Sequence, residues 1–378
     1  MSRDSIGTAT MAERSAVLIV GAGPAGLATA IEARRVGLDV TVLDRRRPPI
    51  DVACGEGLMP AGVERLLGLG VRILDSEATM FHGVRYLDGG VVAEARFSAS
   101  AGLGIRRTGL HRALLDRVEE LGVELRWGTT ARSFDGNAVD TDRGRFEADW
   151  SVAADGRLSR MRKWAGIATT RSGRSRFGIR RHYRLQPWTD VVEVFWADQG
   201  EAYVTPVGPE MVGVAILTAR TPLDFDRELR HFPVLADRLD GAPVASKDRG
   251  AGPFGHRPET VVKDRLALIG DASGSLDPIT GEGVSVAIGQ ARALVRAIGT
   301  GSLDDYPADH ARIMRLPRLL TNLLLHAEGR PGIRRRLIKV LAASPRLFSR
   351  MIDIVGRSGV TGGSRSSEWS WKSSTLEG

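Results

Sequence analysis

The chain of 378 residues contains one cysteine and five lysines, and only 6% of its residues are aromatic. A single cysteine excludes an internal disulfide framework and fits a reducing cytoplasm. No apolar run approaches the roughly 18 to 20 residues that a membrane-spanning helix needs, and residues 1–14 lack the apolar core of a signal peptide. We therefore expect a cytoplasmic protein.

The histidines lack the spacing of metal ligands. They are scattered along the chain, at His82, His111, His182, His231, His256, His310 and His326. Protein zinc sites draw on closely spaced pairs of ligands, and no such pairs occur here. We expect no metal site.

The net charge of +8 comes from 53 lysines and arginines against 45 acidic residues. The arginines are dispersed along the chain. Nucleic-acid binding needs a basic face with interleaved aromatic residues or a recognised module, and the sequence shows neither. We therefore expect no nucleic-acid partner. The hydrophobic content of 42% is that of an ordinary globular protein, and the length allows two joined domains around a large core.

The first glycine-rich segment is Gly21-Ala22-Gly23-Pro24-Ala25-Gly26. Residues 17–20, which precede it, are a short apolar run suited to a buried parallel strand. Residues 24–36 have the composition of a helix and end before Gly37. Strand, glycine turn and helix in this order are typical of a dinucleotide-binding unit.

The residues of this turn have distinct roles in such a unit. Gly21 permits the tight turn, Gly23 lets a pyrophosphate approach the backbone, and Gly26 lets the helix pack closely on the strand. Pro24 lies in the first helical turn, where its missing N–H costs no hydrogen bond. The phosphates are expected to meet N–H groups at the positive end of the helix dipole, around Pro24 and Ala25.

An acidic residue follows the second predicted strand, residues 40–43. Asp44 comes at the distance where a carboxylate accepts hydrogen bonds from ribose hydroxyls. We assign Asp44 and its neighbour Arg45 to the adenosine end of a bound nucleotide. Asp44 does not distinguish NAD from FAD, because both carry an adenosine ribose.

Later segments resemble a known superfamily. Residues 150–162, which contain Ala154-Asp155-Gly156-Arg157, resemble the middle motif of the flavoprotein hydroxylases and reductases typified by para-hydroxybenzoate hydroxylase. Residues 266–274, which contain Gly270-Asp271-Ala272-Ser273-Gly274, resemble the third motif. Within this superfamily, residues 51–58 and 276–284 are similar to segments of the geranylgeranyl reductase family. The resemblance covers roughly residues 15–300.

This resemblance implies that the tightly bound cofactor is FAD in an extended conformation. Further cofactor-binding positions of the family fall on Arg107, Asp155, Gly270, Asp271, Gly281, Glu282 and Gly283. The residue types are compatible with that role. Asp271 ends a predicted strand, 266–269, where a carboxylate can bond a polyol such as ribityl. A helix predicted to begin at Gly281 to Gly283 offers its positive end to a reduced flavin. Taken alone, Asp271 is a turn residue and Arg107 a solvated cation.

The predicted fold class is α/β. A discontinuous Rossmann-type FAD-binding domain takes residues 15–70, 104–173 and 256–300. An inserted substrate domain, residues 71–103 and 174–255, is an antiparallel β-sheet, because the runs 177–184, 191–196, 202–206 and 211–217 alternate and carry aromatic residues. C-terminal helices occupy 301–356, and 357–378 is predicted to be a disordered tail.

The C-terminal residues 316–350 combine apolar residues with cations such as Arg334-Arg335-Arg336. One interpretation is a basic amphipathic surface that makes peripheral contact with the inner face of the membrane. The other, which we favour, is a helical cap on the body of the protein with solvated arginines on its outer face. Both allow a hydrophobic tunnel beneath. The oligomeric state is left open.

The catalytic candidates follow from the resemblance. The family segment beside the flavin ring falls on Cys54 and Glu56. In a reductase, reduced flavin donates hydride to an alkene in an apolar pocket, and a nearby acid supplies the proton. Taken alone, Cys54 is a small buried hydrophobic residue and Glu56 a turn carboxylate or a partner of an arginine.

We expect an FAD-dependent oxidoreductase that takes electrons from NADPH or NADH and reduces a carbon–carbon double bond of a lipophilic, isoprenoid-like substrate. The run Glu201-Ala202-Tyr203-Val204-Thr205-Pro206 departs from the family, because it keeps only the proline and one aromatic of a tyrosine-tryptophan-phenylalanine-proline pattern. This weakens the prediction of a long prenyl substrate.

The sequence leaves two other functions open and disfavours a third. The alternative is a monooxygenase that hydroxylates an aromatic or polyketide substrate, although Ser273-Gly274 stand where hydroxylases usually have a histidine. A flavin-bearing redox sensor without turnover is also compatible with the sequence. A flavin halogenase is disfavoured, because the first lysine is Lys163 and the Trp-x-Trp-x-Ile-Pro segment of halogenases is missing.

Overall fold

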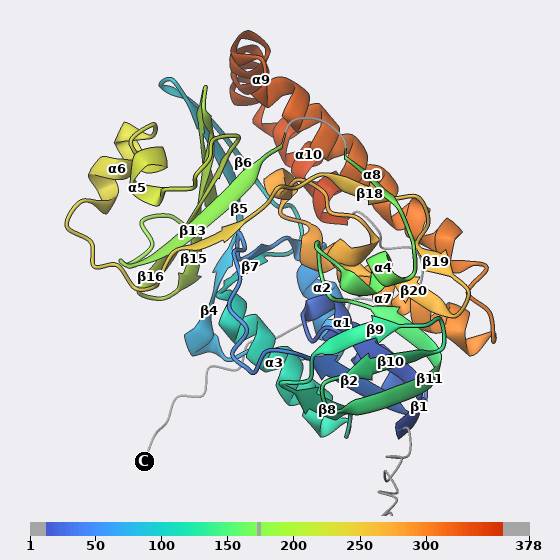
Figure 1. The fold of residues 1–378 in the computed structure, drawn as a ribbon. Coiled ribbons are helices and arrows are strands. Elements are labelled where there is room, and N and C mark those ends of the chain that lie inside the picture. The colour runs from blue at the N-terminus through green and yellow to red at the C-terminus, as the bar shows by residue number, and fades with distance from the viewer. Residues whose placement is uncertain (1–12, 172–174, 358–378) are drawn as a thin grey trace, which may run out of the picture.

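The computed structural model describes residues 13–171 and 175–357 and shows an α/β protein with two large β-sheets (Figure 1). The predicted disordered tail lies outside the described residues, except for Arg357 at the end of the last helix. Within the described ranges, no helix is long and apolar enough to cross a membrane. No cluster of three or more His, Cys, Asp or Glu residues there could hold a metal ion.

The first sheet has eight strands in the order β19-β20-β11-β1-β2-β8, with β10 paired to β11 and β9 paired to β10. Parallel pairing of β1 with both β2 and β11 places it at the centre. The strands come from three separate parts of the chain: β1 (Glu13–Val20), β2 (Val40–Asp44), β8 (Glu124–Trp127), β9 (Ala131–Phe134), β10 (Ala138–Thr141), β11 (Gly144–Ala153), β19 (Val262–Lys263) and β20 (Leu266–Leu268).

Three helices share the core of this sheet. They are α1 (Pro24–Arg35), α3 (Arg107–Glu120) and α7 (Gly283–Gly299). Leu27 of α1, Leu114 of α3 and Leu294 of α7 are fully buried in one cluster with the β1 strand. The predicted helix at 24–36 ends one residue earlier, because Val36 is the C-cap and Gly37 takes a positive φ.

The second sheet has seven strands in the order β17-β13-β16-β15-β14-β5-β6. Every pair is antiparallel except β14 with β5. The strands are β5 (Gly83–Asp88), β6 (Val91–Arg96), β13 (Phe177–Arg184), β14 (Val192–Ala197), β15 (Gly200–Gly208), β16 (Met211–Thr218) and β17 (Arg249–Ala251). The four runs predicted in 174–218 all form strands, with ends within two residues of the prediction. The sheet also joins β5 and β6, from residues 83–96, to strands of residues 177–251.

Short elements connect the two sheets. A three-stranded sheet has the order β3 (Gly57–Leu58), β7 (Gly102–Ile105) and β4 (Ala78–Phe81). The helices α2 (Pro60–Gly68) and η1 (Asp75–Glu77) lie between β3 and β4 in the sequence. β12 (Thr169–Arg171) pairs with β18 (His256–Pro258). The remaining short helices are α4 (Arg160–Trp164), α5 (Phe225–Leu229), α6 (Pro233–Leu239), η2 (Gly270–Ser273) and η3 (Pro278–Thr280).

The C-terminal helices are α8 (Tyr306–Glu328), α9 (Pro331–Ala343) and α10 (Pro345–Arg357), drawn in orange to red in Figure 1. Leu341 and Phe348 of these helices are buried in one cluster with Val84 and Val194 of the second sheet. Arg334 differs from the expected solvated arginine. It is buried and its Nε donates to Asp88 at 2.8 Å, because α9 lies against the turn of the β5–β6 hairpin.

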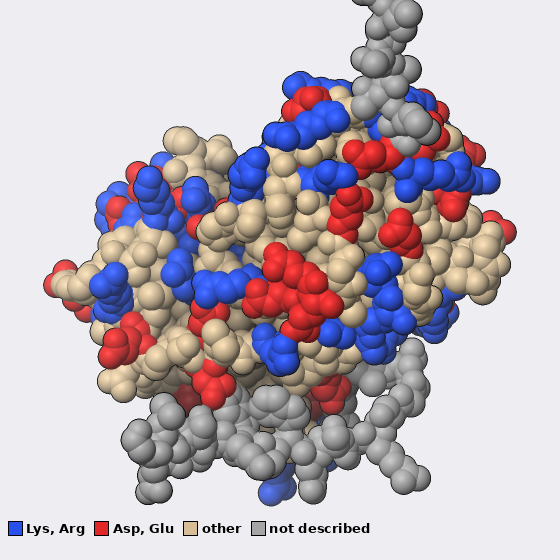
Figure 2. Space-filling view, turned by 90° about the horizontal axis from the view of Figure 1, so that it is seen from below, with Lys and Arg blue, Asp and Glu red and all other residues tan. Residues whose placement is uncertain are grey.

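The charged side chains are mixed on the face shown in Figure 2. Lysines and arginines there are interspersed with aspartates and glutamates. The positive net charge is therefore not gathered into one continuous stripe on that face.

Candidate active site

The glycine turn between β1 and α1 packs tightly at two positions and is open at a third. Gly21 has a φ of +112°, and a Cβ there would lie 2.3 Å from the carbonyl oxygen of Ala154. A Cβ on Gly26 would lie 1.9 Å from the carbonyl oxygen of Gly21. At Gly23 the nearest atom to a Cβ is Nη2 of Arg107, at 3.8 Å. A phosphate can therefore approach the backbone at Gly23.

The start of α1 also contacts the third glycine-rich segment. Gly23 is the N-cap of α1 and Pro24 its first residue, and the first turn contains no acidic side chain. A Cβ on Gly270, whose φ is +58°, would lie 2.7 Å from Cβ of Ala25. The first and third motifs, far apart in sequence, thus adjoin at the positive end of the helix.

Asp44 lies at the end of β2 and stabilises the glycine turn. Its Oδ2 accepts a hydrogen bond from the backbone N–H of Ala22 at 2.9 Å, and its Oδ1 accepts one from Arg46 at 2.8 Å. The side chain is buried, whereas that of the neighbouring Arg45 is exposed. Oδ2 can accept a second hydrogen bond, so Asp44 remains able to bind a ribose hydroxyl.

Arg107 is the first residue of α3 and lies beside the glycine turn. It is 7% exposed, and its Nε has no hydrogen-bond partner among the described residues. Burial lowers the pKa of this guanidinium, while Cys54 and Asp271 nearby act in the opposite direction. A buried cation without a partner at Nε, next to the open backbone of Gly23, is suited to an anionic ligand.

Asp271 and the start of α7 form the other end of this site. The Asp271 side chain is accessible to solvent, yet enough protein surrounds it that burial raises its pKa, against the lowering effect of Arg157 and Arg107. α7 begins at Gly283, where a Cβ would meet no atom within 4 Å, and Gly281 before it has a φ of +69°. Glu282, between them, is buried.

Asp155 has a structural role. Its Oδ2 accepts hydrogen bonds from the backbone N–H groups of Arg160 at 2.7 Å and Met161 at 3.1 Å, which caps α4. Arg162 of the same helix donates to the carbonyl oxygen of Ala272 at 2.9 Å. The middle motif therefore holds the third motif in place, and cofactor binding by Asp155 stays a prediction.

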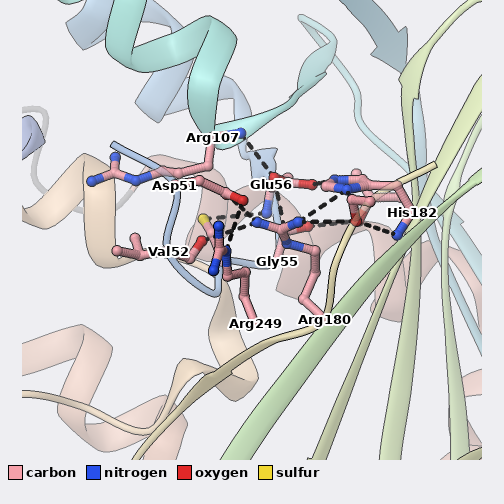
Figure 3. A network of polar contacts seen from close by, with 11 residues as sticks. Asp51, Val52, Gly55, Glu56, Arg107, Arg180, His182 and Arg249 are labelled. Carbon is pink, nitrogen blue, oxygen red and sulfur yellow. Dashed lines mark hydrogen bonds and ion pairs between the residues drawn. The ribbon is translucent and has the colours of Figure 1, made fainter. Parts of the chain in front are cut away.

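The loop that carries Cys54 and Glu56 is anchored by a network of charged side chains (Figure 3). Glu56 accepts a hydrogen bond from the backbone N–H of Arg107 at 2.8 Å through Oε1, and its Oε2 lies 2.5 Å from Nε2 of His182. Arg180 donates to Asp51 and to the carbonyl oxygen of Val52. The network ties the loop both to α3 and to β13.

Cys54 lies in the same loop with a protonated thiol. Its Sγ accepts a hydrogen bond from the backbone N–H of Glu56 at 3.4 Å. Burial raises the pKa of the thiol, with Arg107 lowering it and Glu56 raising it further. Cys54 is therefore a thiol at neutral pH.

These residues fit FAD. Gly23, Arg107 and the N-terminus of α1 would hold its pyrophosphate, Asp44 its adenosine ribose and Asp271 its ribityl chain. The start of α7 offers positive potential to the flavin ring.

The comparisons with known proteins agree with this geometry. A family model described as "FAD binding domain" matches residues 14–301. The chain belongs to this FAD-binding family. It is an FAD-dependent oxidoreductase by that membership and by its relatives, which include reductases.

Two curated relatives illustrate the family. The chain is 28% identical over 324 residues to menaquinone reductase of Mycolicibacterium smegmatis, covering 78% of this chain and 79% of that protein. It is 26% identical over 298 residues to digeranylgeranylglycerophospholipid reductase 1 of Methanothermobacter thermautotrophicus, covering 71% and 72%.

Solved structures share the fold. A flavoprotein/dehydrogenase from Cytophaga hutchinsonii superposes with a TM-score of 0.77 at 18% identity, covering 92% of this chain and 93% of that one. The p-nitrophenol 4-monooxygenase of Pseudomonas putida superposes with a TM-score of 0.75 at 19% identity, covering 93% and 100%.

The FAD-binding oxidoreductase has an apolar cavity of about 220 Å³ beside the Cys54 loop. The second sheet forms one wall, residues 278–281 another, and α8 to α10 a third. Cys54, Glu56 and Gly281 all border it, so the two catalytic candidates lie beside the loop that we expect to contact the flavin. Its aliphatic and aromatic lining includes Val84, Val194, Leu217, Leu324, Leu341 and Phe348.

Two polar side chains at this cavity are engaged in internal hydrogen bonds. The hydroxyl of Tyr203 donates to the carbonyl oxygen of Ile279 at 2.9 Å, and that of Thr205 donates to the carbonyl oxygen of Gly55 at 2.9 Å. Burial raises the pKa of Tyr203 well above its ordinary value. Both hydroxyls thus hold the loops at Gly55 and Ile279 against the sheet.

A buried ionic cluster behind this wall was not predicted from the sequence. Arg176 pairs with Glu201 of β15 and with Asp277, which precedes η3. Glu201 stood out only as part of a run that departs from the family. The available signal was a carboxylate within an otherwise apolar strand, because such a group needs a buried cation. Arg180 and Asp51 were likewise not predicted as site residues.

Proposed function

We propose that this oxidoreductase reduces a carbon–carbon double bond of a lipophilic, isoprenoid-like substrate, with NADPH or NADH as the electron donor. The observation that carries the proposal is the cavity beside Cys54, whose walls are aliphatic and aromatic side chains from the second sheet and α8 to α10. An apolar cavity favours a hydrocarbon chain, because burial of each methylene group contributes about 0.8 kcal/mol.

The polar groups near the cavity favour reduction over hydroxylation. A phenol hydroxylase needs groups that orient the phenol and help to deprotonate it. The two best candidates in the second sheet are Tyr203 and His182. The hydroxyl of Tyr203 already donates a hydrogen bond to the carbonyl oxygen of Ile279, and His182 is fully buried against Glu56. Hydride transfer to an alkene requires mainly orientation, exclusion of water and one proton donor.

The protein's part in this reaction follows from its residues. Bound FAD, when reduced, supplies the hydride. The sheet and helices hold the substrate chain and exclude water, and Tyr203 and Thr205 fix the loops on either side of the flavin. Cys54 carries a proton on a thiol that borders the cavity, and Glu56 lies two residues away. These two remain our proposed candidates for delivering the proton to the substrate carbon.

The deciding experiment is product mass. Purified holoprotein is incubated with NADPH or NADH and a panel of polyprenyl lipids, prenylquinones and aromatic polyketides. A gain of two hydrogens supports the proposal. If the product instead gains one oxygen atom that comes from labelled molecular oxygen, the monooxygenase alternative replaces this proposal. Conversion of no substrate would favour a redox sensor.

We also propose peripheral contact with a membrane through the C-terminal helices. Six exposed aliphatic residues lie there: Leu319, Leu323, Ile333, Val340, Leu347 and Ile354. Residues 312–354 are all described, and their exposed charged side chains are arginines and one lysine, with no acidic one. Leu323 is 51% exposed and also borders the cavity, so the cavity reaches the surface beside α8. This supports entry of a lipid substrate from an anionic bilayer.

A further inference from the structure

The ring of His182 is held in one tautomer by its neighbours. Its Nδ1 lies 3.0 Å from Nη1 of Arg180 and 2.8 Å from Oγ of Ser246. An arginine can only donate hydrogen bonds, so Nδ1 must accept. Ser246 Oγ already accepts from the backbone N–H of His182 at 3.1 Å, which leaves its own hydrogen free to point at Nδ1. The ring proton is therefore on Nε2.

This proton assignment determines the hydrogen bonds of Glu56. With hydrogen on Nε2, His182 donates to Oε2 of Glu56 across 2.5 Å. Oε1 accepts the backbone N–H of Arg107 and lies 3.8 Å from Nε of Arg180. Both oxygens thus face donors, and the side chain is 1% exposed. Glu56 therefore accepts one hydrogen bond at each carboxyl oxygen, from two distant parts of the chain.

The backbone at Glu56 depends on these contacts. Glu56 has a φ of +61°, in the left-handed region that favours glycine, and glycines flank it on both sides. A non-glycine residue remains there only when surrounding contacts hold it. The partners of its carboxylate come from α3, a helix packed against the first sheet, and from β13 of the second sheet. The side chain thus fastens a strained loop at the junction of cofactor site and substrate wall.

We infer that His182 is a positioning residue that acts through Glu56 to set the place of Cys54 and of the start of α3, where Arg107 lies beside Gly23. This role requires no particular substrate, so it holds for a reductase or a monooxygenase. The other charged groups that face the pair are Arg180 of β13, which Asp51 neutralises, and Arg249 of β17, which donates to Asp51 at 3.0 Å.

Cys54 provides a direct readout of loop position, because the chain has no other cysteine. The test compares His182→Phe, which removes the donor, with His182→Gln, whose amide N–H can replace Nε2–H. His82→Phe is the matched control, because His82 is exposed. The holoprotein of each variant is treated with a thiol reagent, and the rate of Cys54 modification and the affinity for FAD are measured.

His182→Phe should raise the modification rate and weaken FAD binding about tenfold, as for one lost hydrogen bond to a charged group. His182→Gln should restore both values toward those of the unmodified protein, and His82→Phe should change neither. A folded His182→Phe protein with unchanged Cys54 reactivity and FAD affinity would overturn the inference, as would a His182→Gln protein no better than His182→Phe.

A second measurement needs no variant. Nitrogen-15 NMR of the imidazoles distinguishes a ring protonated at Nε2 from one protonated at Nδ1 or at both. The inference requires the Nε2-protonated form for His182 at neutral pH. A ring protonated only at Nδ1, which cannot donate to Glu56 through Nε2, would contradict it even if His182→Phe failed to fold.

Discussion

Nη2 of Arg176 lies 2.6 Å from each carboxylate oxygen of Glu201, and neither side chain is more than 5% exposed. Nη1 of Arg176 also donates to Asp277 at 3.1 Å, and Asp277 accepts the backbone N–H of Ile279 at 3.2 Å. The ion pair therefore joins β15 to the segment that leads into Gly281 and α7. Buried charge thus holds β15 and the loop before α7 together.

We expect Glu201→Gln to destabilise the protein by about 3 to 5 kcal/mol, because it leaves part of a buried positive charge uncompensated. Asp149→Asn is the matched control. Its partner Arg14 lies at the same distance of 2.6 Å, but both side chains are well exposed. The control should cost at most about 1 kcal/mol. Urea unfolding of both variants measures the difference, and equal losses would show that burial does not set the energy of this pair.

Gly23→Val should abolish FAD binding while the protein still folds. A Cβ at Gly23 meets no protein atom closer than 3.8 Å, so the added side chain fills the space through which a pyrophosphate approaches. The measurement is flavin content after reconstitution, with circular dichroism to establish folding. Gly299→Val, at the end of α7, is the control, because a Cβ there meets no atom within 4 Å. A folded Gly23→Val protein with normal flavin content would contradict the assignment.

Asp44→Ala should weaken FAD binding by about 1 to 3 kcal/mol, since a charged hydrogen-bond acceptor is lost at the adenosine end. The same change removes the acceptor for the N–H of Ala22, which holds the glycine turn. Titration of the apoprotein with FAD and with FMN separates the two contributions. FMN lacks the adenosine half, so its binding should change little if Asp44 acts at the ribose.

Cys54→Ala should keep nearly full FAD content and lower turnover. The hydrogen bond that Sγ accepts from Glu56 N–H is a weak one to sulfur, so its loss should leave the loop in place. The thiol itself borders the cavity, where a proton is needed. Steady-state rates and flavin content are compared with those of Cys54→Ser. Turnover equal to that of the unmodified protein in both Cys54→Ala and Glu56→Gln would show that the loop is only structural.

Acid should destabilise the fold through three histidines that are buried or half-buried. Burial lowers the pKa of His111, His256 and His310 to about 4. An unfolded histidine titrates near pH 6.5, so the unfolded chain binds protons first as the pH falls. The contribution to stability is present above about pH 6.5 and is lost as the pH falls toward 4. Urea unfolding at pH 7 and 5 tests this. His111→Gln should reduce the loss, and His82→Gln should not.

The sequence and the structure agree where the signal is local. The turn at Gly21 to Gly26 and the strands of 174–218 follow from short-range patterns of glycine and apolar residues, and α1 and β13 form there. The partners of Glu56 and Glu201 could not be predicted in this way. His182 is 126 residues from Glu56, and a buried carboxylate shows only that it needs a partner, not which residue of a distant strand supplies it.

The C-terminal helices show the same limit and carry the last prediction. Their amphipathic pattern was evident, but not which residues would pack on the sheet: Arg334 is buried, whereas Arg336 and Lys339 are exposed.

Flotation with vesicles that contain anionic lipid should show that the protein binds them and that this binding falls with added salt. The double variant Arg336→Glu with Lys339→Glu should weaken it at least tenfold, since each cation near an anionic surface contributes about 1 kcal/mol. Lys163→Glu with Lys247→Glu has the same change in net charge at exposed lysines outside these helices, and should retain most of the binding. Equal loss in both double variants would mean that total charge rather than the α8 to α10 surface governs the contact, and that lipid substrates do not enter beside Leu323 from a bound membrane.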